Sequence, residues 1–119
     1  WDPDTDEGTA PGVGTDPTVT PVADPPTAPT GLSVTDDAGT ETISFTAPND
    51  LRVAACRVWR GTTTTFADAT DISDALYCSP NQVLNYEDTP GTGTWYYWVT
   101  AENLAGDLSD ETGPETVTI

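Results

Sequence analysis

The sequence predicts an all-β fold: an antiparallel β-sandwich of seven short strands, preceded by an extended N-terminal arm. Residues 27–119 contain short apolar–polar alternations at regular spacing, separated by turn residues and without a convincing helical pattern. The stretch from Gly93 to Asn103 combines four aromatic residues with β-branched ones and marks the strongest strand. Residues 1–26 contain six prolines and no basic residue, so we expect them to form a linker or arm outside the domain at 27–119.

Six strands can be assigned from the pattern of apolar and turn residues along the domain. The clearest ones are residues 31–35, 41–46, 54–60, 83–87, 93–103 and 115–119. Residues 66–75 allow either a helical turn or a short edge strand. Alternation predicts these inward side chains: Leu32, Val34, Ile43, Phe45, Cys56, Val58, Trp95, Tyr97, Val99 and Ala101.

The charge of the chain limits its partners. Twenty acidic residues face three arginines, with no Lys and no His, which gives a net charge of -17. Such a surface repels phosphate backbones and anionic lipids, so we expect no nucleic acid partner. The negative charge is expected to keep the protein soluble. Alternatively, it indicates a protein that works in high salt, where the repulsion between its carboxylates is screened.

Targeting signals are not visible in the sequence. No apolar run approaches the ~20 residues needed to cross a bilayer, so membrane insertion is not expected. The chain begins at Trp1 without a Met, and we therefore expect it to be a piece of a longer protein.

One acidic cluster in the arm has some features of a calcium loop. Asp2, Asp4 and Asp6 alternate and are followed by Glu7 and Gly8, although an EF-hand loop places its Gly directly after the third Asp. The simpler interpretation is a solvated acidic linker. No other cofactor is expected.

Several segments resemble the fibronectin type III family. The segment from Pro26 to Thr35 is similar to its opening strand, and Ile43 to Pro48 to its second strand. Cys56 to Gly61 resembles the third strand, and Gly93 to Gly106 the sixth strand with its loop. The resemblance covers about residues 26–119 and implies an immunoglobulin-like sandwich.

Three residues depart from the family pattern. Phe45 stands where the family usually has Trp, Cys56 where it has Tyr, and Trp95 where a corner tyrosine is expected. Because an indole only donates, the last change predicts the loss of a hydroxyl-to-backbone hydrogen bond.

The composition also argues against catalysis. Without His or Lys, the chain has no Ser-His-Asp or Cys-His constellation and no Schiff-base lysine. Two cysteines without His do not make a zinc site. We therefore expect a protein that is not an enzyme.

The two cysteines, Cys56 and Cys78, are predicted to form a disulfide. It would close a loop of about 20 residues and contribute ~3 kcal/mol in the chain-entropy model. The alternative is a pair of free buried thiols, because Cys56 is at a core position and free Cys packs well there.

The resemblance places the third and sixth strands side by side, which would gather Arg57, Trp59, Tyr96 and Trp98 on the outer face of one sheet. We consider three interpretations: an internal ladder of stacked arginine and aromatic side chains that stiffens the sheet under the Pro-rich arm, a docking patch for a neighbouring subunit, and a sugar-binding platform on a host or substrate.

These observations lead to a functional expectation. Within the family, the segment after the third strand is most like modules in tail and fibre proteins of tailed viruses. This resemblance implies a structural or attachment module on a virion surface, a tail, fibre or capsid component, whose partners are repeated or homo-oligomeric subunits or a host glycan. The alternative is an extracellular spacer or adhesion module of a secreted or cell-surface protein that is glycan-active or filament-forming.

Overall fold

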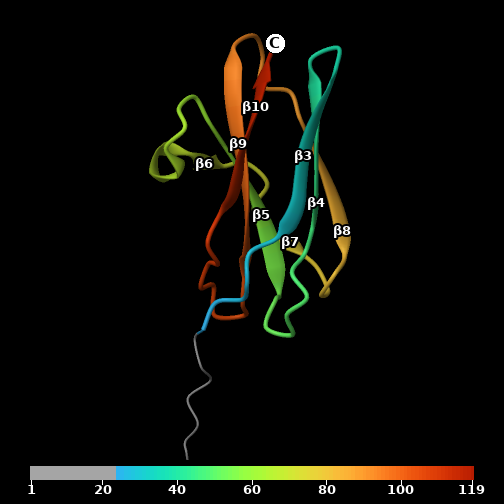
Figure 1. Ribbon diagram of the computed structural model, residues 1–119, viewed down its shortest axis with the longest axis vertical. Coiled ribbons are helices and arrows are strands. Elements are labelled where there is room, and N and C mark those ends of the chain that lie inside the picture. Colours follow the sequence, from blue (N-terminus) through green and yellow to red (C-terminus); the bar gives the residue numbers. More distant parts are fainter. Residues whose placement is uncertain (1–23) are drawn as a thin grey trace, which may run out of the picture.

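The structure, a computed structural model, describes residues 24–119. In this part of the chain two antiparallel sheets face each other (Figure 1). One sheet has the order β3 (Thr30–Asp37), β4 (Thr40–Thr46) and β8 (Val83–Asp88). The other has the order β10 (Thr112–Thr118), β9 (Thr94–Glu102), β5 (Ala55–Gly61) and β6 (Thr70–Asp71), and β7 (Leu76–Tyr77) also pairs with β5. The predicted all-β, antiparallel architecture is therefore confirmed.

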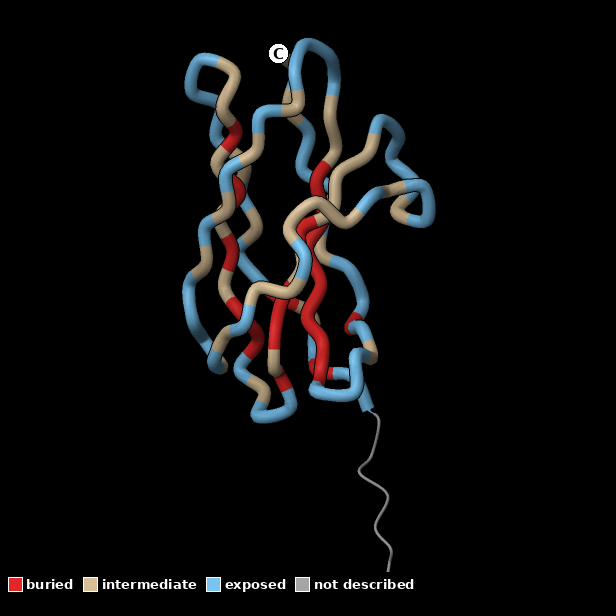
Figure 2. Tube along the Cα trace, turned by 180° about the vertical axis from the view of Figure 1, so that it is seen from behind, coloured by how far each residue is buried: buried red, intermediate tan, exposed pale blue. Residues whose placement is uncertain are grey.

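The core lies between the two sheets and is formed by the side chains that alternation placed there. Ile43 and Phe45 from β4 are buried in one cluster with Val58 from β5 and with Tyr97 and Val99 from β9. Figure 2 shows the buried stretches running along the central strands, while the loops at both ends are exposed. Burying one face of each sheet against the other is the main source of stability in such a fold.

The strands agree with the sequence prediction except around residues 66–77. The uncertain segment contains both structures that the sequence allowed: a 3-10 turn at Phe66–Asp68 and the short strand β6. Strand β7 was not predicted. Its two residues form a strand only because they pair with Ala55 and Cys56, and two residues are too few to display an alternation.

The two ends of the described chain lie at opposite ends of the sandwich. The described chain begins at residue 24, at the end of the sandwich that carries the loops after β4 and β9 (Figure 1). Ile119 lies at the other end, beside the start of β9. We call the first end, made of residues 24–27, 49–53 and 103–107, the N-terminal pole.

Candidate functional site

The outer face of β5 and β9 brings together the residues singled out in the sequence. The register pairs Trp59 with Trp98 and Gly61 with Tyr96, and Arg57 lies opposite Thr100. Strands β5 and β9 are hydrogen-bonded neighbours, so their outward side chains share one surface.

Another part of the chain covers much of this surface. Trp98 is only 1% exposed although it points away from the core between the sheets. The ring of Phe66, from the 3-10 turn between β5 and β6, lies edge-on to both tryptophans, with ring centroids 5.3 Å from Trp59 and 5.7 Å from Trp98. The aromatic side chains therefore form a second, smaller apolar cluster under this turn.

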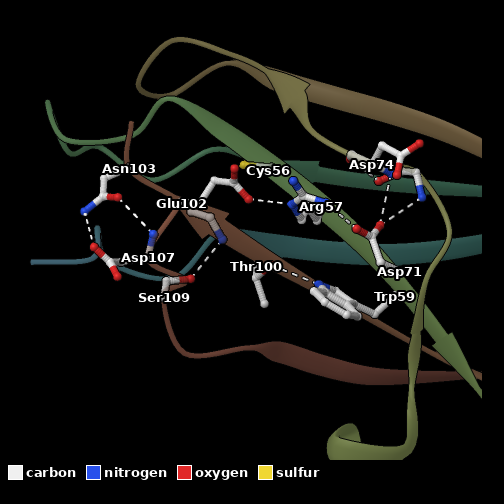
Figure 3. Close-up of polar contacts among 12 residues, drawn as sticks. Cys56, Arg57, Trp59, Asp71, Asp74, Thr100, Glu102, Asn103, Asp107 and Ser109 are labelled. Carbon is white, nitrogen blue, oxygen red and sulfur yellow. Dashed lines mark hydrogen bonds and ion pairs between the residues drawn. The ribbon is translucent and has the colours of Figure 1, made fainter. Parts of the chain in front are cut away.

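Polar contacts complete the same face, as Figure 3 shows. The indole Nε1 of Trp59 donates to Oγ1 of Thr100 at 3.0 Å. The guanidinium of Arg57 donates to the carboxylates of Glu102 and Asp71, and these hydrogen bonds raise the pKa of Arg57. A half-buried arginine held by two carboxylates stiffens the face between β5, β6 and β9.

These contacts are internal to the domain, but they differ from the ladder of stacked arginine and aromatic side chains in the first interpretation. The cover of the tryptophans in the described residues is Phe66, and the partners of Arg57 are carboxylates rather than aromatic rings. Residues 1–23 lie outside the described residues, so the proposed cover by the arm stays a prediction. Sugar binding and subunit docking at this face also stay predictions.

Trp95, which the resemblance predicted to lack a hydroxyl-to-backbone hydrogen bond, makes a backbone hydrogen bond through its indole instead. Its indole Nε1 donates to the backbone carbonyl of Gly91 at 2.9 Å. The guanidinium of Arg60 lies 4.9 Å from the Trp95 ring centroid, a cation–π contact. The donor has changed, but the corner is still tied to the backbone before it.

The predicted disulfide is not formed. Cys56 and Cys78 are both free thiols, and their Sγ atoms are 3.7 Å apart, against about 2.05 Å in a disulfide. Cys78 reaches this position because its backbone N–H donates to Ala54 beside β5. Burial raises the pKa of the Cys56 thiol, which keeps it protonated. The two sulfurs pack as neighbours at the edge of the core, as the alternative interpretation stated.

The calcium candidate Asp2, Asp4 and Asp6 lies outside the described residues. Within residues 24–119, no three His, Cys, Asp or Glu side chains are grouped so that they could hold a metal ion.

The N-terminal pole carries an apolar surface that sequence reasoning missed. The side chains of Leu51 and Leu104 are 95% and 94% exposed, in the loops after β4 and β9. Between these loops is an open pocket of about 280 Å³, lined by Asp24 and by residues 51–53 and 103–105. Two almost fully exposed leucines beside one pocket are a typical sign of an interaction surface.

Asn103 fixes the backbone that presents Leu104. Its side-chain Oδ1 accepts hydrogen bonds from the backbone N–H groups of Ala105 and Asp107, both at 3.0 Å. Its Nδ2 donates to the backbone carbonyl of Asp24 at 2.9 Å. One buried amide therefore shapes the loop and fastens the incoming chain to it.

Asp50 fixes the backbone of the loop that presents Leu51. Its carboxylate accepts from the backbone N–H groups of Arg52 and Thr27 and from the Arg52 guanidinium, at 2.9 to 3.0 Å. Hydrogen bonds from Arg52 hold the pKa of Asp50 below its ordinary value. Residues 24–27, which include the end of the predicted arm, are thus attached to both loops of the pole.

A signal for these leucines does exist in the sequence. Each is a large apolar residue inside a turn of polar and glycine residues, Asn49-Asp50-Leu51-Arg52 and Asn103-Leu104-Ala105-Gly106. A turn at the surface has no core in which to bury such a side chain. The sequence alone does not show that the two turns lie at the same end of the domain.

The chain was compared with models of known protein families and with curated proteins, and neither comparison found a match. No helix among residues 24–119 has the length and apolar character needed to cross a membrane.

Proposed function

We propose that the chain is a non-enzymatic structural or attachment module with a fibronectin type III-like fold, and that it contacts a neighbouring protein through its N-terminal pole. The assembly that the sequence resemblance favours is a virion surface, where such modules occur in tails and fibres. The observation that carries the proposal is the pair of exposed leucines held beside one pocket by fixed loops.

Two points support the family assignment. Strands β5 and β9, which correspond to the third and sixth strands of the resemblance, pair along their length. In the opposite sheet the first two strands, β3 and β4, pair with each other and β4 pairs with β8, an arrangement compatible with immunoglobulin-like sandwiches.

The geometry of the pole supports contact with a protein. Apolar side chains that stay exposed while their backbone is fixed need little ordering on binding, which lowers the entropic cost of association. Leu51 and Leu104 meet this condition, because Asp50 and Asn103 hold their loops. Hot spots of protein interfaces typically combine such rigid anchors with a pocket.

Charge indicates the chemistry of the partner. A second copy of the chain would bring the same net charge of -17 and would be repelled at low salt. The Asp24 side chain at the pocket is 66% exposed, and its ion pair with Arg52, at 3.9 Å, is longer than the 2.9 Å pair that Arg52 makes with Asp50. The partner is therefore a basic protein surface that inserts an apolar side chain into the pocket between Leu51 and Leu104.

Site-specific photo-crosslinking in the native assembly tests this proposal. A photoreactive amino acid at position 51 or 104 of the full-length protein should crosslink to one partner protein, at a segment that contains Lys or Arg. Tyr77 and Val83 are matched controls, since both are large, exposed apolar residues and neither lines the pocket. Equal crosslinking from all four positions, or crosslinks only between copies of this chain, would contradict the proposal.

Substitution provides an independent readout. Leu51→Ser with Leu104→Ser should lower incorporation into the assembly at least tenfold without lowering stability, because neither side chain is buried. Tyr77→Ser should leave incorporation unchanged. A double variant that assembles normally would show that the pole is not the interface.

A spacer role in a secreted or cell-surface protein is the second candidate. It is favoured by the position of the chain ends, because a module that enters at one pole and leaves at the other fits in line between neighbours (Figure 1). Electron microscopy of the full-length protein separates the two roles. A spacer appears as one bead in an extended string, and an attachment module appears docked on a particle at the symmetry of the assembly.

A further inference from the structure

Glu41, near the start of β4, is a charged residue inside the sandwich. It is 0% exposed and lies on the same face of β4 as Ile43 and Phe45. Neither of its carboxylate oxygens has a hydrogen-bond donor within the described residues. An ionised carboxylate without donors or a counter-charge is very unfavourable in the interior of a protein.

The strands on both sides of β4 place further acids against Glu41. The register puts Asp36 of β3 directly opposite it on one side and Asp88 of β8 directly opposite on the other. Directly opposite residues in antiparallel strands point to the same face, so three acidic residues form one row across the sheet. Side chains at directly opposite positions are neighbours across the two strands, so the carboxyl groups of Asp36 and Glu41 can meet on this face.

The three arginines are all paired with other carboxylates. The sequence has three arginines and no Lys or His. Arg52 pairs with Asp50 at the N-terminal pole. Arg57 pairs with Asp71 and Glu102 on the outer face of β5 and β9. The Nη1 of Arg60 donates hydrogen bonds to both carboxylate oxygens of Asp88, at 2.9 and 2.7 Å.

The hydroxyl of Tyr97, from β9, is also engaged elsewhere. It donates to Asp88 at 2.7 Å. Burial and the neighbouring Asp88 raise the pKa of Tyr97, so this hydroxyl stays protonated. Asp88 is therefore bound by Arg60 and Tyr97, while Glu41 and Asp36 are left to each other.

Two carboxylates cannot form a hydrogen bond, because both groups only accept; one of them must carry a proton. We propose that Glu41 is protonated in mildly acidic solution, that it donates this proton to Asp36, and that this carboxyl pair is a proton-binding site whose loss of the proton loosens the end of the β3–β4–β8 sheet. Asp36 is the ionised partner because it is exposed, and its Oδ1 already accepts from the Gly39 N–H. The site does not depend on the proposed function.

Proton affinity supports this assignment. Burial, followed by the contact with Asp36 and the charges of Asp36 and Asp88, raises the pKa of Glu41 from 4.5 to about 7. In the unfolded chain the pKa returns to its ordinary value. The folded state therefore binds more protons between these two values, and its extra stability is fully present below pH 4.5 and is lost as the pH rises through about 7. This dependence has the opposite sign to ordinary acid denaturation.

Glu41→Gln is the informative variant. Glutamine has the same shape, cannot ionise, and offers N–H donors to Asp36. We expect the unfolding equilibrium constant of the natural chain, from urea titrations, to rise more than tenfold between about pH 5 and about pH 8. That of Glu41→Gln should change by less than threefold over the same range. Glu87→Gln, which removes a charge from an exposed neighbour on β8, should keep the natural dependence.

Carbon-13 NMR of the glutamate side chains tests the site without a mutation. The Glu41 carboxyl should titrate with a midpoint near pH 7, the value at which its proton is lost. A midpoint near the ordinary value of 4.5, or a Glu41→Gln variant with the natural pH dependence, would overturn the proposal. It would also be overturned if added Ca²⁺ or Na⁺ abolished the titration, because the pair would then hold a metal cation in place of the proton.

Discussion

Ala38 occupies a backbone conformation that alanine rarely adopts. The hairpin between β3 and β4 turns through Ala38 and Gly39, with φ angles of 53° and 91°. Positive φ at both positions is characteristic of a two-residue hairpin turn in which Asn-Gly is preferred. Alanine there carries a strain of about 1 kcal/mol, because its Cβ approaches the following carbonyl.

Ala38→Asn should therefore raise the free energy of unfolding by about 0.5–1 kcal/mol. The measurement is the urea midpoint, with an unchanged slope. Ala67→Asn is the control, because Ala67 is exposed and has no positive φ. If Ala38→Asn gave no more stability than Ala67→Asn, strain at the turn would not be the reason.

The sequence predicted some residue environments and not others. The alternation that placed Ile43 and Phe45 inside also places Glu41 inside, and the turn at 36–39 brings Asp36 opposite it. The sequence could not show that Asp88, far along the chain, completes the row. For the cysteines it indicated proximity, but whether two sulfurs bond or only touch depends on a distance that spacing does not determine.

At the scale of elements, the bulge in β10 depends on a glycine. The register between β10 and β9 shifts between Thr112 and Glu115, and Gly113 in this region has a φ of 129°. A Cβ at Gly113 would lie 2.6 Å from the carbonyl oxygen of Tyr97, a distance that side chains do not tolerate. Gly91 also has a positive φ, of 96°, but a Cβ there would meet nothing within 4 Å.

Gly113→Ala should thus destabilise the fold by about 2–4 kcal/mol, and Gly91→Ala by only about 1 kcal/mol. Thermal unfolding of both variants measures the difference between their losses of stability. This difference separates the cost of the clash with the Tyr97 carbonyl from the cost of a positive φ. Equal losses would mean that β10 shifts away from Tyr97 at no cost.

The turn that carries Phe66 is a structural element in its own right. Phe66→Ala should lower the free energy of unfolding by about 1–3 kcal/mol, because it uncovers Trp98 and leaves Trp59 without its edge contact. Phe66→Leu, which keeps an apolar cover, should lose less than half as much. Acrylamide quenching of tryptophan fluorescence should increase in the alanine variant only. A Phe66→Ala protein as stable as the natural one would mean that Phe66 is not a structural cover, which would favour the docking interpretations of this face.

Elements with their own alternation were predictable, and elements made by distant pairing were not. Strands β4, β5 and β9 bury one side or both, and β3 and β8 alternate half-buried with exposed residues, so the pattern of apolar residues identifies them. Strand β7 and the placement of Phe66 over β9 depend on contacts with residues far away in the sequence. The outer aromatic residues were placed together correctly, but their cover could not be foreseen.

The whole molecule is dominated by its negative charge. With twenty acidic residues and three basic ones, the folded state concentrates like charges that the unfolded chain keeps further apart. Raising NaCl from about 0.01 M to about 1 M shortens the Debye length from about 30 Å to about 3 Å. We expect the melting temperature to rise over this range by several degrees.

The same titration near pH 3 is the control, because protonated carboxylates no longer repel one another. The salt effect should then largely disappear. A melting temperature that falls with NaCl at neutral pH would mean that the arginine ion pairs outweigh the repulsion.

The opposite positions of the two chain ends also determine how the module would carry tension. The chain enters at the pole from which β3 departs and leaves at the pole where β10 ends (Figure 1). A pull on the two ends would act along these strands, so that the ladders of β3 with β4 and of β10 with β9 are loaded in shear. Many hydrogen bonds must then break together instead of one after another. The first and last strands of this sandwich would therefore act as its mechanical clamps.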